Sequence, residues 1–146
     1  MSHRWRYYKG FWRFQNIAVP QGATIETASF KVYWENGGER TFKVIALAND
    51  DAPQPTDDTY ANHDLETTAS VDWTIDYHGT SGSVAHTVEV KTIIQEIVDR
   101  SGWSSGNAIM LMVRLDEPNL NSTKDRDAHM SESTDDEQPE LTITYS

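Results

Sequence analysis

Hydrophobic and polar residues alternate along much of the chain, which is the pattern of β-strands with one buried face. Phe30, Val32 and Trp34 fall on one side of such a strand. Asn36-Gly37-Gly38 follows as a turn signal, because Asn and Gly tolerate positive φ, and residues 41–47 then alternate again. We therefore expect these two segments to pair as a hairpin.

Further segments carry strand signals of other kinds. Residues 11–19 end at the turn signal Pro20-Gln21-Gly22, and residues 108–115 are almost wholly apolar, as expected for a strand buried on both faces. The remaining predicted strands are residues 71–75, 129–133 and 141–145.

Residues 90–100 break the β pattern, because their apolar residues recur at helical spacing and Gly102 follows as a stop signal. Seven to nine short strands with one short helix predict an all-β fold, an antiparallel β-sandwich of jelly-roll type. We expect an N-terminal basic and aromatic arm over residues 1–10 and a single sandwich domain over residues 11–146.

Composition narrows the classes of function. The chain has 146 residues and no cysteine, which excludes disulfides and thiolate metal sites. No apolar run reaches the length of a membrane span, and the N-terminus lacks the apolar region of a signal peptide. Two interpretations of the N-terminus follow: export by another route, as in a virion released by lysis, or a sequence trimmed at its start. We expect a virion-surface or extracellular location and no membrane partner.

The net charge of −11 is unevenly distributed. Residues 1–25 contain four cations and no acid, whereas acidic residues concentrate in residues 50–66 and 116–140. Such a field repels phosphates, so a nucleic-acid partner is not expected. A surface with few lysines and many carboxylates suits high salt, because salt screens the repulsion between the carboxylates. Two interpretations therefore remain: a halophilic protein and an ordinary acidic protein.

Candidate chemistry is sparse. Residues 102–106 match the G-x-S-x-G pattern of a hydrolase nucleophile, but a predicted helix precedes the motif and a strand follows it, the reverse of the required order. We interpret the motif as a connector in which Trp103 packs as a plug. The five histidines show no metal-ligand spacing, and we expect them to be exposed.

Three acidic pairs offer hard oxygen ligands: Asp50-Asp51, Asp57-Asp58 and Asp135-Asp136. A structural calcium ion is one interpretation of these pairs, and solvated acidic loops are the preferred one. No obligate cofactor and no catalytic residue is expected.

Several stretches carry a family resemblance: FWRFQNIAVPQGATI at 11–25, TASVDW at 68–73, IIQEIV at 93–98, GWSSGN at 102–107 and LTITY at 141–145. They resemble jelly-roll modules of phage structural proteins and of secreted multidomain bacterial proteins, which are similar to carbohydrate-binding modules. The resemblance implies an accessory module and not an enzyme. The chain departs from the family pattern in its basic arm and in residues 116–140.

The arm interleaves cations and aromatic rings. Its candidate partner-binding residues are Arg4, Trp5, Arg6, Tyr7, Tyr8 and Lys9. Arg, Trp and Tyr are enriched in interface hot spots, and an acidic neighbour, including another copy of this chain, would attract the cations. The alternative is a first strand that pairs within its own domain.

Two functions follow as expectations. The first is a structural protein of a virion surface, a capsid decoration or tail-associated subunit, that docks through its arm onto other copies of itself or a shell protein. The second is a carbohydrate-binding module with Tyr33, Tyr60 and Tyr77 as glycan contacts. A glycoside-active enzyme is a distant third, because nothing singles out a catalytic carboxylate pair.

Overall fold

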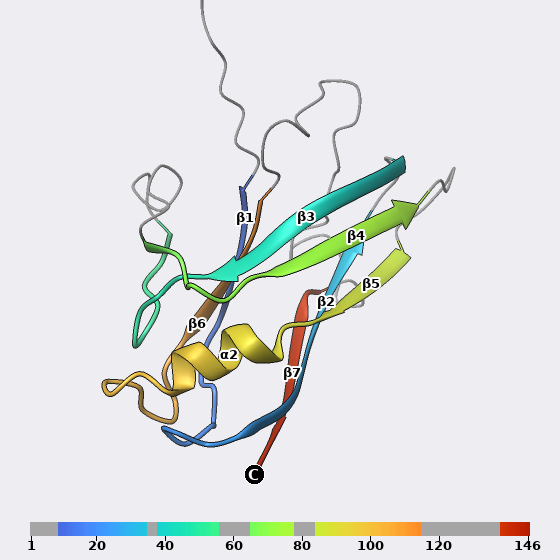
Figure 1. Cartoon of the computed structure of the whole chain (residues 1–146). Helices are drawn as coiled ribbons and strands as arrows, with labels where there is room; N and C mark the ends of the chain where they lie inside the picture. The colour runs from blue at the N-terminus through green and yellow to red at the C-terminus, as the bar shows by residue number, and fades with distance from the viewer. Residues whose placement is uncertain (1–8, 35–37, 56–64, 78–83, 115–137) are drawn as a thin grey trace, which may run out of the picture.

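The computed structural model describes residues 9–34, 38–55, 65–77, 84–114 and 138–146. Seven strands and one helix form in these ranges (Figure 1): β1 (Lys9–Phe14), β2 (Ile25–Trp34), β3 (Gly38–Ala46), β4 (Val71–Tyr77), β5 (Val84–Glu89), α2 (Lys91–Val98), β6 (Ile109–Arg114) and β7 (Glu140–Tyr145). The protein is an all-β sandwich with one short helix, as the alternation of the sequence predicts.

The strands form two antiparallel sheets. One has four strands in the order β1-β6-β3-β4, and the other has three in the order β5-β2-β7. Partners are far apart in the sequence: Phe11 pairs with Met112, and Phe30 pairs with Leu141. The predicted strands at residues 71–75, 108–115 and 141–145 are confirmed as β4, β6 and β7.

The predicted hairpin between residues 29–35 and 41–47 is wrong. The two strands exist as β2 and β3, but β2 lies in the three-stranded sheet and β3 in the four-stranded sheet. Trp34 and Phe42 face each other across the interior, their rings stacked with centroids 5.0 Å apart. Alternation assigns each strand a buried face, yet it cannot tell two paired strands from two strands that face each other, because both arrangements bury the same positions.

Aromatic rings pack against one another in the interior between the sheets, with aliphatic side chains around them. Phe30 of β2 lies at its centre, with Trp12 at 5.5 Å and Trp73 at 5.8 Å between ring centroids. These three side chains are 0–7% exposed. Edge and tilted ring contacts of this kind add to the free energy of burying the ring surface. Within the described residues, no strand of one sheet pairs with a strand of the other, so the packing of these rings and of the surrounding aliphatic side chains joins the two sheets.

Helix α2 closes one end of the sandwich, and its position confirms the helix predicted over residues 90–100. Ile93, Ile94 and Ile97 are 0–1% exposed against the core. On the polar side, the Gln95 amide accepts from the Ile25 backbone N–H at 2.8 Å and donates to the Ala23 carbonyl at 2.9 Å. The helix thereby fixes the start of β2 as well as covering the core.

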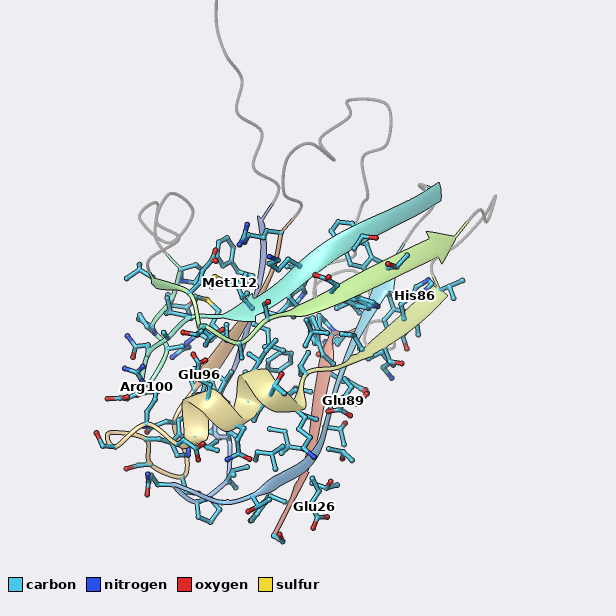
Figure 2. The ribbon with its side chains drawn as sticks, in the orientation of Figure 1. Glu26, His86, Glu89, Glu96, Arg100 and Met112 are labelled. Atoms are coloured by element: carbon cyan, nitrogen blue, oxygen red, sulfur yellow. The ribbon has the colours of Figure 1, made fainter. Side chains whose placement is uncertain are left out.

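Glu96 ties the same helix to the other sheet (Figure 2). Its two carboxylate oxygens accept from the backbone N–H groups of Thr68 and Ala69, at 2.9 and 2.8 Å, just before β4 begins. Hydrogen bonds to a carboxylate are stronger than neutral ones. One short helix thus anchors both sheets through two adjacent polar residues.

The four-stranded sheet has a second buried cluster on its outer face. Met110 and Met112 of β6 and Ile45 of β3 are 0–1% exposed there, and Phe11 packs against them. Residues 47–55 fold back beside this cluster: the Ala52 N–H donates to the Ala108 carbonyl at 3.0 Å. The prediction that residues 108–115 are buried on both faces is therefore correct, and the loop after β3 is part of the reason.

Two details of the sequence prediction change, and one is not tested. The first strand ends at Phe14 and does not continue to Val19, because Asn16 takes a φ of 57°, in the left-handed region that an extended strand excludes. β5 was not predicted, since residues 84–89 carry few large apolar side chains. Residues 129–133 lie outside the described residues.

Candidate functional site

The residues that the sequence nominates are only partly within the described structure. Lys9 is the first residue of β1 and pairs in register with Arg114, so β1 includes the last two residues assigned to the arm. Arg4, Trp5, Arg6, Tyr7 and Tyr8 lie outside the described residues, as does Tyr60.

The two remaining tyrosines belong to different sheets. Tyr33 lies on β2 in the three-stranded sheet, paired with Ala85, and Tyr77 lies at the end of β4 in the four-stranded sheet, paired with Gly38. The structure therefore does not bring Tyr33 and Tyr77 together on one sheet face.

Tyr33 belongs to the outer face of the three-stranded sheet, which we call the hydroxyl face. Register and burial place alternating residues of β2, β5 and β7 on this face, all half-buried or exposed. Its members are Thr27, Ser29, Lys31, Tyr33, Ala85, Thr87, Glu89, Glu140, Thr142 and Thr144. Half of these side chains are Ser or Thr, and Tyr33 is the one aromatic ring among them, so the face is polar and rich in hydroxyl groups.

Charge on the hydroxyl face is concentrated in one pair. The Lys31 ammonium lies 2.8 Å from the Glu140 carboxylate and 5.7 Å from the centroid of the Tyr33 ring. The hydrogen bond to Glu140 raises the pKa of Lys31 above its ordinary 10.5; desolvation opposes this shift, and attraction to Glu140 adds to it. The stabilisation from this shift is complete below pH 10.5 and is lost as the pH rises through the folded-state pKa.

Among the described strands, β7 has one backbone edge that no other strand pairs with. Ser146 exchanges both backbone hydrogen bonds with Thr24, at 3.0 and 3.1 Å, so its N–H and C=O groups point toward β2. Backbone groups alternate in direction along a strand, so those of Leu141, Ile143 and Tyr145 point away from β2. β7 is the end strand of its sheet, and no other strand in the described part of the chain pairs with this side.

The acidic pair Asp50-Asp51 has partners from the protein itself. Asp50 Oδ1 accepts from Arg100 Nε at 2.6 Å, and Asp51 Oδ1 accepts from the Ala108 N–H at 2.8 Å. Within the described ranges, no three His, Asp or Glu side chains gather as a metal site. The other two acidic pairs, at residues 57–58 and 135–136, lie outside the described residues.

The histidine and G-x-S-x-G expectations have different outcomes. His86 is half-buried, and its pairing with the core residue Val32 places it on the inner side of β5, so exposure was the wrong expectation there (Figure 2). The other four histidines lie outside the described residues. Trp103 is 2% exposed and its Nε1 donates to the Val19 carbonyl at 2.8 Å, which confirms its expected role as a plug.

The sequence identified the strand at residues 141–145 but not its edge position. Alternation in LTITY shows which residues face the core, whereas strand order depends on which distant segment pairs beside it. Pro139, directly before β7, is the one local hint, because proline is tolerated at sheet edges.

The fold and these surfaces define a class, an antiparallel β-sandwich module with a polar sheet face and a free strand edge. No protein-family model matches the chain, and no curated protein has a significantly similar sequence. The part of the chain that the structure describes contains no helix with the length and apolar character to cross a bilayer.

Proposed function

We propose that this protein is a non-enzymatic structural subunit of a virion surface, a capsid decoration or tail-associated protein, that docks through its N-terminal residues. The observation that carries the proposal is the position of β1. It is an edge strand of the four-stranded sheet and begins at Lys9. The chain therefore enters the sandwich at an edge, directly after five residues of the hot-spot types Arg, Trp and Tyr.

Several polar side chains of the described residues hydrogen-bond to other parts of the fold, which supports a structural role for the protein. Glu96 binds the backbone before β4, Gln95 binds the backbone at the start of β2, and Asp50 binds Arg100. Glu89 accepts from the Ala28 and Lys91 N–H groups at 2.6 and 3.0 Å. These groups hold elements together instead of converging on a shared cleft, which suits a module whose task is to be rigid and to present surfaces.

The direct test removes the proposed docking segment. We expect the full-length protein to associate with other copies in sedimentation velocity, in a concentration-dependent way, and a variant lacking residues 2–8 to sediment as a monomer with an unchanged fold by circular dichroism. A matched variant, Arg4→Gln with Arg6→Gln, keeps the length and rings but loses two charges, and should associate more weakly than the full-length protein. Monomers at every concentration for both the full-length and the shortened protein would contradict docking onto other copies.

A carbohydrate-binding module is the second candidate, favoured by the hydroxyl face. Tyr33 lies there beside hydroxyl groups, and a flat ring with hydrogen-bonding neighbours suits the face of a sugar ring. Glycan-array binding that is lost in Tyr33→Ala and kept in Thr87→Ala would support this function. Absence of binding in the unmodified protein would remove it.

A further inference from the structure

We propose that the free edge of β7 is the docking site for the arm, and that residues 2–8 of a second copy add there as a strand. This inference rests on the proposed function and names its partner surface. Addition of a strand to an open sheet edge is a recurrent mode of recognition, in which backbone hydrogen bonds supply affinity and alternating side chains supply specificity.

The backbone of β7 provides the acceptor edge. Leu141, Ile143 and Tyr145 present N–H and C=O groups away from β2, whereas the two backbone hydrogen bonds of Ser146 run on the β2 side. An exposed row of unpaired backbone groups is a template for another strand. The three residues of β7 whose backbone groups point away from β2 span about five residues of the strand. Residues 2–8 are long enough to pair along that length.

The inner side chains of β7 are incompletely covered. Leu141 and Ile143 pack against the core yet remain half-buried, and Tyr145 is 43% exposed. Core residues of the neighbouring strand β2, such as Ala28 and Phe30, are 0% exposed. A further strand beside β7 would complete the cover on this side of the sandwich and bury apolar surface.

The arm has the pattern of such a strand. Trp5 and Tyr7 alternate with Arg4, Arg6 and Tyr8. With Trp5 and Tyr7 on the core side, the rings would lie next to the inner residues of β7. Arg4 and Arg6 would then lie on the hydroxyl face near Glu140, whose side chain is 60% exposed even though it pairs with Lys31.

Geometry favours a second copy over the chain's own arm. β1 starts at Lys9 in one sheet and β7 lies in the other, and packed sheets are about 10 Å apart. A chain needs roughly three residues to cross that distance, which would leave too few to cover β7. An arm from another copy can use all of residues 2–8.

The position of the edges permits a reciprocal exchange. β4 and β5 contact each other, so they are adjoining edges of the two sheets, and β1 and β7 are the edges on the opposite side (Figure 1). The arm therefore leaves from the same side of the sandwich that carries the acceptor edge. Two copies related by a two-fold axis could each donate an arm to the other, and a two-fold axis is the commonest symmetry of protein dimers.

The absence of cysteine makes disulfide trapping a clean test. We would compare Arg6→Cys/Thr142→Cys with the control Arg6→Cys/Thr87→Cys; Thr142 and Thr87 are exposed on the same sheet face but on opposite edge strands. Arg4→Cys in place of Arg6→Cys tests a register shifted by two residues. The readouts are non-reducing electrophoresis and peptide mapping after mild oxidation of dilute full-length protein.

We expect the Thr142→Cys variant to form covalent dimers in a yield at least severalfold higher than that of the Thr87→Cys control. Cross-linked monomers at Thr142 would overturn the exchange between copies, since the arm would then bind its own edge. Yields at Thr142 no higher than at Thr87 would overturn docking at β7. In that last case, loss of association on deleting residues 2–8 would leave the proposed function standing with a different docking surface.

A backbone variant tests the edge independently of cysteine. Tyr145→Pro removes an N–H that points away from β2, whereas Tyr145→Val removes the ring and keeps the N–H. We expect Tyr145→Pro to associate roughly tenfold more weakly than Tyr145→Val, because an added strand loses a hydrogen bond there. Equal association of the two variants would count against strand addition.

Discussion

Gly102 lies against the carboxylate of Asp50, and the space that a side chain would fill there is already occupied. A Cβ atom on Gly102 would overlap Asp50 Oδ2 and lie 2.7 Å from Asp50 Cγ. The same carboxylate accepts from Arg100 Nε, with the two side chains 43% and 38% exposed. Because a half-exposed ion pair contributes little by itself, the close fit around it matters as much as its charge. The absence of a side chain at Gly102 therefore leaves room for the Asp50–Arg100 pair.

Gly102→Ala should lower the free energy of unfolding by at most about 1 kcal/mol, because the half-exposed Asp50 carboxylate must rotate away from the added methyl group and give up its pairing with Arg100. Asp50→Ala removes the overlapping carboxylate, so Gly102→Ala should cost much less in that background. Urea unfolding of the two single variants and the double variant measures the difference, with the exposed neighbour Ser101→Ala as a control. Equal costs of Gly102→Ala in both backgrounds would show that Asp50 is not the obstacle.

At the scale of elements, the sequence predicted most strands and their buried faces, but not their partners. β6 was recognisable from its unbroken apolar run, and α2 from its helical spacing, because both signals are local. The pairing of β2 and β3 was predicted wrongly and β5 was missed, since strand order depends on segments more than 50 residues apart, such as Phe11 and Met112. The edge at β7 could not be predicted for the same reason.

Burial of the outer face of β6 should contribute measurably to the stability of the fold. Met112 is 1% exposed although it points away from the interior of the sandwich (Figure 2). Met112→Ala should therefore cost about 2–5 kcal/mol of unfolding free energy, as expected for a core site. Thr74→Ala, at an exposed outer position of β4 in the same sheet, should cost less than about 1 kcal/mol, because it removes only an exposed hydrogen bond of 2.8 Å to the Thr41 hydroxyl. Similar small losses for both variants in chemical denaturation would show that this cluster adds little to stability.

For the molecule as a whole, charge should act in opposite directions on folding and on association. The net charge of −11 favours expansion of the chain, whereas docking of a cationic arm onto an acidic copy uses attraction. Salt shortens the screening length from about 10 Å at 0.1 M to about 3 Å at 1 M and weakens both effects.

Raising NaCl from 0.1 to 1 M should thus increase the free energy of unfolding while weakening association of the full-length protein. Urea titrations and sedimentation velocity at each salt concentration measure the two quantities. The variant lacking residues 2–8 is the control, because its unfolding should respond to salt and its monomeric state should not. Unfolding that becomes easier in salt would mean that attractive pairs such as Lys31–Glu140 outweigh the net repulsion.

The order of the strands also constrains how the protein is made. Among the described strands, β1 pairs with β6 alone, and β2, at the centre of its sheet, needs β7 on one side. During synthesis the four-stranded sheet cannot close until residue 114 has left the ribosome, and the three-stranded sheet cannot close until residue 145 has, so the Trp- and Phe-rich N-terminal third must wait without its partners. Distant pairings of this kind slow folding and expose aggregation-prone segments meanwhile. Chaperone demand in the cell should therefore arise early in translation, long before the last strand is available.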